Sequence, residues 1–167
     1  MGIVKSTPVA IALGSNLGDR EQLLRDAAAA LAPFVDDIHL SSFRDTAPVG
    51  VNADQPTFLN AALTGQTSLS ARALLELLLE IEQQFGRRRP YPGAARTLDL
   101  DLILYGDTVI DEPPTLIVPH PRFRERLFVL DPLAEIAGAW IDPVTGTSVK
   151  ALRDQASGVR PRATGLG

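Results

Sequence analysis

Two aspartates in residues 96–104 carry the clearest chemical signal in the sequence, because the segment alternates as a β-strand does. One face would be formed by Leu98, Leu100, Leu102 and Leu104. The other face would be formed by Thr97, Asp99, Asp101 and Ile103. At a rise of about 3.3 Å per residue, the Cα atoms of Asp99 and Asp101 would lie roughly 6.5–7 Å apart, so their carboxylates would repel each other. A divalent cation is the usual reason for such a pair, and Mg²⁺ prefers carboxylate oxygens combined with substrate phosphates.

Basic residues surround this acidic pair in the sequence. Three consecutive arginines, Arg87, Arg88 and Arg89, precede the segment, and Arg96 stands directly before it. Metal-binding acids beside basic residues indicate a polyphosphate site. The alternative is an exposed strand face whose acids and arginines are simply solvated, and this pattern alone leaves both interpretations open.

The composition is that of a soluble globular domain. The chain has 167 residues, of which 45% are hydrophobic and 22% charged, enough for one domain with a real core. A net charge of -4 argues against general nucleic-acid binding, and the absence of cysteine excludes disulfides and thiolate chemistry. No apolar run approaches the roughly 20 residues of a membrane span. Residues 1–8 lack the pattern of a signal peptide, so we expect a cytoplasmic protein without membrane contact.

The order of predicted elements indicates an α+β fold. Strands are expected over residues 8–13, 38–46, 57–67 and 97–104. A helix capped by Asp19 is expected to follow the first strand, and one capped by Ser70 to follow the third. Such a β-α-β-β-α-β order is typical of a ferredoxin-like antiparallel sheet with helices on one face.

The last third is expected to extend this core with a hairpin and helices. The hairpin would turn at residues 105–108, and helical segments would cover 122–126 and 128–137, the second broken near Pro132. We expect a single domain over residues 1–156 and a flexible tail over 157–167.

Four motifs of the chain, in this order and spacing, resemble those of the 6-hydroxymethyl-7,8-dihydropterin pyrophosphokinase family. They are ALGSNLG at 12–18, DQPTFLNAA at 54–62, RTLDLD at 96–101 and VPH at 118–120. The first motif lacks the lysine of a P-loop, so it receives no phosphate-binding role on its own. The resemblance covers residues 10–137. It implies transfer of pyrophosphate from ATP to the hydroxymethyl group of a dihydropterin in folate biosynthesis, with release of AMP and with two Mg²⁺ ions.

The resemblance also implies a set of site residues. The metal ligands would be Asp99 and Asp101, which with Arg87 and Arg96 form the predicted catalytic group. The pterin would contact Thr46, Pro48, Val49, Phe58, Asn60 and Phe128, the last by stacking. ATP would contact Glu82, Arg89, His120 and Arg126. Considered singly, the two phenylalanines would be core residues, the asparagine a strand-edge residue and the histidine a surface residue.

Several positions depart from the family pattern. Tyr91, flanked by prolines, stands where many members carry a tryptophan, while Ala95 replaces a common proline and Pro121 a common tyrosine. These changes concern the basic segment and ATP affinity rather than the aspartates. Two other functions remain open at this stage: a phosphotransferase that releases ADP, and a ligand-binding regulator without activity, because this fold hosts many functions. We predict a monomer whose only partners are small molecules, although no pattern in the sequence bears on the oligomeric state.

Overall fold

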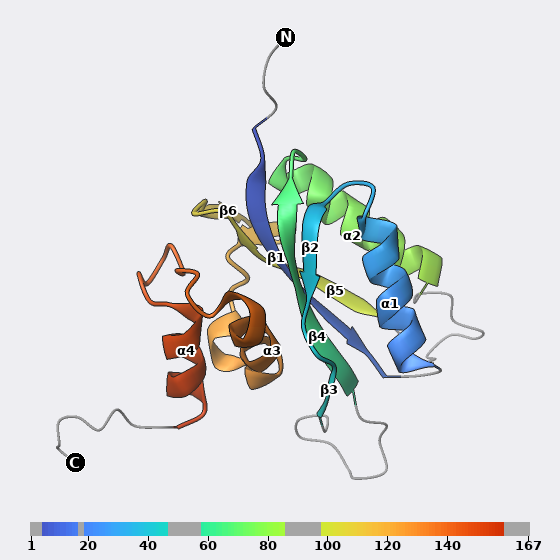
Figure 1. Ribbon diagram of the computed structural model, residues 1–167. Helices are drawn as coiled ribbons and strands as arrows, with labels where there is room; N and C mark the ends of the chain where they lie inside the picture. Colours follow the sequence, from blue (N-terminus) through green and yellow to red (C-terminus); the bar gives the residue numbers. More distant parts are fainter. Residues whose placement is uncertain (1–4, 17–18, 47–57, 86–97, 159–167) are drawn as a thin grey trace, which may run out of the picture.

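The computed structural model describes residues 5–16, 19–46, 58–85 and 98–158. Figure 1 shows a twisted antiparallel sheet with helices on both faces. The strands of the main sheet are β1 (Thr7–Ser15), β2 (Asp36–Leu40), β3 (Arg44–Thr46), β4 (Phe58–Thr67) and β5 (Asp99–Tyr105). A second, two-stranded sheet consists of β6 (Ile110–Glu112) and β7 (Leu116–Val118). The helices are α1 (Arg20–Leu31), α2 (Ala71–Phe85), the 3-10 turn η1 (Phe123–Glu125), α3 (Leu127–Ala137) and α4 (Val149–Ala156).

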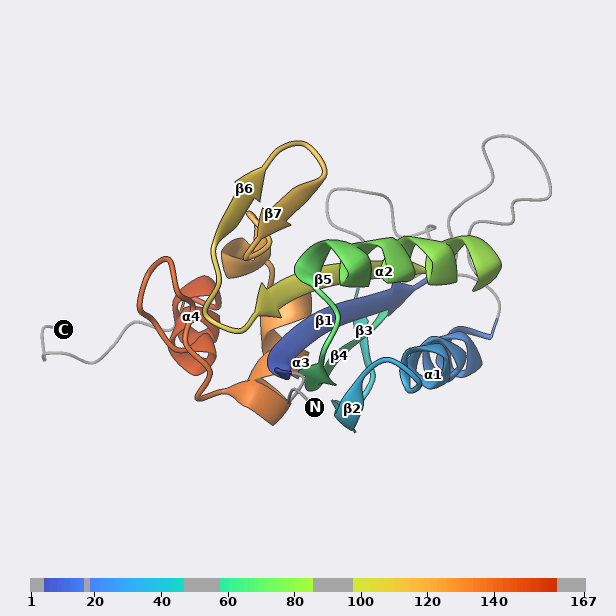
Figure 2. The ribbon, with the colours of Figure 1, turned by 90° about the horizontal axis from the view of Figure 1, so that it is seen from above.

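The main sheet has the predicted ferredoxin-like topology. Its strand order is β2-β4-β1-β5, all antiparallel, and β3 adds a short pairing to β4. Helices α1 and α2 cover one face, while α3 and α4 lie on the other side (Figure 2). The fold prediction is therefore confirmed, and the C-terminal third adds a helical layer that the ferredoxin-like core lacks.

Local sequence signals account for the helix starts. The Asp19 carboxylate accepts a hydrogen bond from the Gln22 amide at 3.1 Å, and the Ser70 hydroxyl accepts one from the Ala73 amide at 3.1 Å. Both caps satisfy amides that have no partner within the helix. Helix α2 then presents a buried apolar stripe to the sheet.

The predicted strand over residues 38–46 is divided in the structure. β2 ends at Leu40 and β3 begins at Arg44. Between them, Ser41 uses its hydroxyl as well as its backbone to bind β4, because its Oγ accepts from the Ala62 amide at 2.8 Å. A side chain thus replaces a backbone acceptor, which interrupts the strand at this point.

The alternation predicted for β5 holds for three leucines and fails at Leu104. Ala10 pairs with Leu104 and Ile11 pairs with Leu102, so Ile103 is an extra residue in the ladder. Such a β-bulge shifts the following side chains. Leu98, Leu100 and Leu102 consequently pack in the core under α1 and α2, whereas Leu104 packs in the core under α3.

Two other expectations are corrected. The segment after the turn at residues 105–108 does not return along β5, because β6 pairs with β7 instead. Helix α3 runs unbroken through Pro132. Its Val129, Leu130 and Leu133 are buried, and this packing outweighs the hydrogen bond that a proline removes from a helix.

The longest described helix, α2, has 15 residues. No helix within the described ranges combines the length and hydropathy needed to cross a membrane. Helix α4 contributes Val149 and Leu152 to the core beneath α3. Residues 159–167, most of the predicted tail, lie outside the described part of the chain.

Candidate active site

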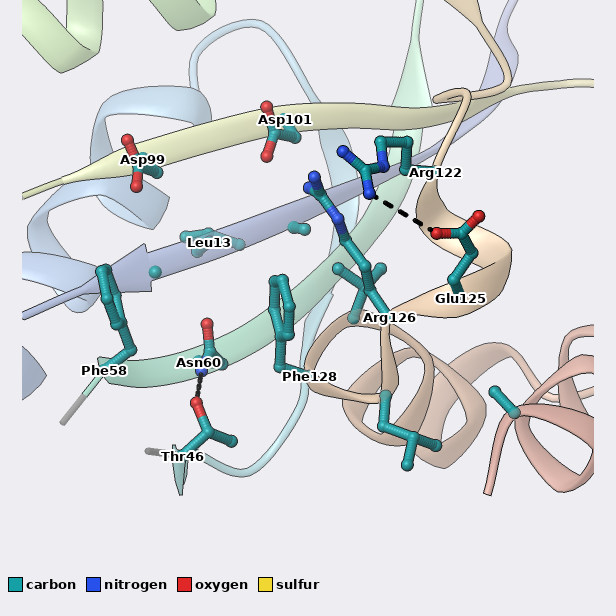
Figure 3. A pocket seen from close by; sticks show the side chains of 15 residues that line it. Leu13, Thr46, Phe58, Asn60, Asp99, Asp101, Arg122, Glu125, Arg126 and Phe128 are labelled. Atoms are coloured by element: carbon teal, nitrogen blue, oxygen red, sulfur yellow. Dashed lines mark hydrogen bonds and ion pairs between the residues drawn. The ribbon is translucent and has the colours of Figure 1, made fainter. Parts of the chain in front are cut away.

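A cavity of about 860 Å³ opens at one end of the sheet, between β1, β4 and β5 on one side and the η1–α3 segment on the other (Figure 3). Residues far apart in the sequence meet there. Thr46, Phe58, Asn60, Asp99, Asp101, Arg126 and Phe128 all line it. The structure therefore brings together seven of the residues that the sequence predicted for the site.

Asp99 and Asp101 point from β5 into this cavity, side by side (Figure 3). Their partners on the neighbouring strand are Gly14, which has no side chain, and Ala12, which has only a methyl group, and both also line the cavity. Among the described residues, no group of three or more His, Cys, Asp or Glu side chains could hold a metal. A pair of carboxylates facing open space suits Mg²⁺, which is usually bound by one or two carboxylates together with substrate phosphates and water.

Two aromatic rings and an amide form the end of the cavity near β3. The half-buried rings of Phe58 and Phe128 stand on either side of Asn60 (Figure 3). The Asn60 side chain is only 6% exposed, and its Nδ2 donates a hydrogen bond to Thr46 Oγ1 at 2.5 Å. Faces of aromatic rings beside a fixed amide can bind a flat heterocycle with a polar edge.

Gly14 fits closely against this amide. A Cβ atom added at Gly14 would lie 3.0 Å from Asn60 Oδ1 and 3.9 Å from the Phe58 ring. No phosphate-binding role was predicted for the glycine-containing motif, and the structure places Gly14 beside the Asn60 amide. Its lack of a side chain leaves room for Asn60 Oδ1 beside β1.

Two arginines form the opposite wall. Arg126 lies with its guanidinium carbon 5.6 Å from the centre of the Phe128 ring. Arg122, which the sequence analysis did not select, also lines the cavity and forms an ion pair with Glu125 at 3.7 Å. Figure 3 shows both guanidinium groups reaching toward the Asp101 side of the cavity. Arg122 stands two residues after the VPH motif, and this position is the signal that could have identified it.

His120 lies at a second cavity of about 270 Å³, which also touches Asp101. Apolar residues of α2, β5 and β7 form most of its wall, which also includes Pro114 and Pro121. The bulge in β5 anchors this region, because the Ile103 carbonyl accepts a hydrogen bond from the His120 amide at 3.0 Å. The two cavities thus share Asp101.

The hydrogen-bonding state of His120 follows from its surroundings. Burial lowers the pKa of His120, and the nearby charges of Arg126 and Arg122 lower it further, whereas Asp101 acts to raise it. The ring is therefore neutral at pH 7. Its Nδ1 accepts a hydrogen bond from the Arg122 amide at 3.2 Å, which leaves Nε2 as the N–H donor.

The structure places Glu82 apart from both cavities. It lies on α2, only 5% exposed, and lines neither of them. Its Oε2 accepts a hydrogen bond from the Leu100 amide at 2.7 Å. Pro48, Val49, Arg87, Arg89 and Arg96 lie outside the described residues, as does Tyr91.

Two anchors outside the cavity fix its walls. The buried Asp142 carboxylate binds Arg124 of η1 through two hydrogen bonds, of 2.5 and 3.0 Å. Glu135 of α3 accepts hydrogen bonds from the Ser42 amide and hydroxyl, at 2.9 and 2.6 Å, just before β3. The C-terminal layer therefore holds both the basic wall and the strand that carries Thr46.

Comparisons with known proteins agree with this geometry. A family model described as 7,8-dihydro-6-hydroxymethylpterin-pyrophosphokinase matches residues 10–138. The chain is 52% identical over 128 residues to 2-amino-4-hydroxy-6-hydroxymethyldihydropteridine pyrophosphokinase of Bacillus subtilis, covering 75% of each chain. It is 41% identical over 160 residues to the protein of the same name from Synechocystis, covering 93% of this chain and 80% of that one.

A solved structure shares the fold. A crystal structure of Plasmodium falciparum HPPK-DHPS superimposes with a TM-score of 0.73 at 13% sequence identity. The match covers 90% of this chain but only 44% of the Plasmodium chain. At this identity the likeness supports the fold alone.

Proposed function

Because the chain belongs to the 7,8-dihydro-6-hydroxymethylpterin-pyrophosphokinase family, it is an ATP-using pyrophosphokinase of folate biosynthesis, and we propose that its two adjoining cavities bind the pterin and ATP on either side of Asp101. The single observation that carries this assignment is the meeting of the two cavities at one of the paired aspartates. The transferred group would then pass between two substrates that both reach the same carboxylate.

The pterin occupies the end of the larger cavity near β3. Phe58 and Phe128 offer their ring faces to the flat pterin, and Asn60 offers an amide to its polar edge. Because Thr46 Oγ1 holds Asn60 Nδ2, the amide keeps one orientation before the substrate arrives. Pro48 and Val49 remain predicted pterin contacts.

ATP spans the second cavity and the basic wall. The apolar surface of the smaller cavity suits the adenine base, and the neutral His120 can donate from Nε2 to a phosphate oxygen. Arg126 and Arg122 supply positive charge where the triphosphate would enter the larger cavity. Arg87, Arg89 and Arg96 remain predicted phosphate contacts.

Asp99 and Asp101 hold two Mg²⁺ ions in this proposal. Bound Mg²⁺ would neutralise charge on the phosphates and lower the pKa of the attacking hydroxyl. The two carboxylates suit this role because they share one face of β5 and open onto the cavity that both substrates reach.

The reaction that follows is an in-line displacement at the β-phosphorus of ATP. The hydroxymethyl oxygen forms the new bond to that phosphorus, the bond to the oxygen that bridges the α- and β-phosphates breaks, and AMP leaves. The hydroxyl proton passes to a carboxylate of the aspartate pair. The chain contributes mainly by holding the pterin, as Phe58, Asn60 and Phe128 do, and by balancing charge, as Arg126 does.

Product analysis tests the activity and variant kinetics test the site. The protein, mixed with ATP, Mg²⁺ and 6-hydroxymethyl-7,8-dihydropterin, should release AMP and form the pterin diphosphate, whereas ADP would contradict the reaction. Phe128→Ala should raise the KM for the pterin and leave the KM for ATP nearly unchanged. His120→Ala should do the reverse, and equal changes in both constants would contradict the division between the cavities.

A monomeric state and a cytoplasmic location complete the proposal. Sedimentation equilibrium of the purified protein and fractionation of its source cells test these two points directly.

A further inference from the structure

Glu82 is an ionisable residue in an apolar surface. On α2 it lies next to Ile81 and one turn from Leu78, all of them buried against the sheet. Taking a carboxylate out of water is costly unless it gains hydrogen bonds, and a leucine at this position would bury itself without that cost. A contact made by the Glu82 carboxylate should therefore explain its presence.

One contact of the carboxylate is with the backbone between the two proposed metal-site aspartates. Glu82 Oε2 accepts the hydrogen bond of the Leu100 amide at 2.7 Å, and Leu100 separates Asp99 from Asp101. In an antiparallel ladder, alternate residues direct their amides toward opposite neighbours. β5 is the last strand in the described part of the sheet, so this amide points to a side where no described strand lies. The Glu82 carboxylate therefore accepts the hydrogen bond that a backbone carbonyl of a neighbouring strand would otherwise accept.

We propose that Glu82 is a positioning residue for the metal site, because it fixes the backbone of β5 at Leu100 and so keeps both flanking carboxylates directed into the cavity. This inference rests on the proposed metal-binding role of Asp99 and Asp101. It is distinct from the ATP contact that the resemblance implied for Glu82, which lines neither cavity among the described residues.

The position of Asp99 explains why such an anchor is needed. Asp99 is the first residue of β5, and the ends of an edge strand are held by few hydrogen bonds. The ladder with β1 holds one side of the strand, through the pairing of Asp99 with Gly14. The bond from Glu82 holds the other side, so the strand cannot twist about its axis and move the two carboxylates apart.

Three variants separate this role from the alternatives. Glu82→Gln keeps an oxygen acceptor for the Leu100 amide and loses the charge. Glu82→Leu removes the acceptor and keeps the burial. Glu80→Leu is the matched control, because Glu80 is an exposed acid two residues away on the same helix.

The measurement is Mn²⁺ binding to each protein saturated with α,β-methylene ATP, followed by electron paramagnetic resonance. Glu82→Leu should weaken Mn²⁺ binding by about tenfold or more, the effect usual for residues that orient metal ligands. Glu82→Gln should stay within about threefold of the unaltered protein because the hydrogen bond is kept, and Glu80→Leu should show no change. Circular dichroism and the melting temperature report whether each variant is folded.

Each other outcome overturns the inference. Unchanged Mn²⁺ affinity in folded Glu82→Leu would make Glu82 a merely structural residue. An equal loss in Glu82→Gln and Glu82→Leu would show that the charge, not the backbone contact, matters, and the Gln variant decides this even if the Leu variant does not fold. Failure of Asp101→Asn to weaken Mn²⁺ binding would instead contradict the proposed metal site itself, which distinguishes the two hypotheses.

Discussion

The substitution Gly14→Ala tests whether the pterin end of the cavity depends on the close approach of Asn60 to β1. The added Cβ would lie 3.0 Å from Asn60 Oδ1, so one of the two must move by a few tenths of an ångström. Gly14 cannot move easily, because it is paired with Asn60 on one side and Asp99 on the other. The amide must therefore turn, against its 2.5 Å hydrogen bond to Thr46.

The expected magnitude follows from the hydrogen bonds that we propose the Asn60 amide makes to the pterin. A neutral hydrogen bond contributes about 0.5–1.5 kcal/mol, and turning the amide should lose about one of them, which corresponds to a roughly 2- to 13-fold rise in the KM for the pterin. The KM for ATP should change by less than about twofold, because the proposed ATP site does not include Asn60. Overpacking should also lower the free energy of unfolding by about 1–3 kcal/mol.

A double-mutant cycle assigns the effect to the amide. Steady-state kinetics with the pterin varied at saturating ATP would be measured for Gly14→Ala, Asn60→Ala and the double variant. If the methyl group acts through Asn60, adding Gly14→Ala to Asn60→Ala should cost almost nothing further. Equal costs in both backgrounds, or an equal rise in the two KM values, would refute the reasoning.

Three further predictions concern the metal pair and the anchors of the C-terminal layer. Asp99→Ala or Asp101→Ala should remove nearly all turnover while the circular dichroism spectrum stays unchanged; near-normal activity in either would contradict the metal assignment. Asp142→Ala leaves the half-buried guanidinium of Arg124 without its carboxylate. The loss of these charge-assisted hydrogen bonds should cost about 1.5–3 kcal/mol, a fall of roughly 3–12 °C in melting temperature. A loss under 1 kcal/mol in denaturant titrations would show that the ion pair is not an anchor. Hydrogen bonds from Ser42 hold the pKa of Glu135 below its ordinary value of 4.5, so the stability that the Glu135 carboxylate contributes is complete above that pH and is lost as the pH falls. Below pH 4.5 the free energy of unfolding should therefore fall less steeply in Glu135→Gln than in the unaltered protein. Parallel curves of unfolding free energy against pH for the two proteins would argue against this.

The sequence was sufficient for the elements whose patterns are local. The ferredoxin-like order and the helix caps at Asp19 and Ser70 follow from periodicity and capping chemistry, and the structure confirms them. Asp99 and Asp101 line the same cavity because alternate residues of a strand point to the same face of the sheet. These features can be predicted from local sequence because they do not depend on which residues pack against them in the folded protein.

The features that the sequence did not reveal depend on tertiary partners. The bulge at Ile103 has no mark in a segment where every second residue from 98 to 104 is leucine, so Leu104 was assigned to the wrong face. The unbroken course of α3 through Pro132 depends on how its apolar side packs under the sheet. The hydrogen bond from the Leu100 amide to Glu82 could not be predicted for a related reason, since only the position of β5 beside α2 shows which amide the carboxylate meets.

The location of the aspartate pair on an edge strand explains how the site is held. On a central strand, the outward groups of β5 would be used by another strand. At the edge they are available, and two of them anchor the site: the Leu100 amide binds Glu82, and the Ile103 carbonyl, set out of register by the bulge, binds the His120 amide. One anchor fixes the aspartates from α2 and the other brings the histidine loop beside Asp101. A continuous strand added at this edge would compete for both groups. The edge position of β5 is therefore what allows a helix and a loop to bind its outward backbone groups beside the candidate site.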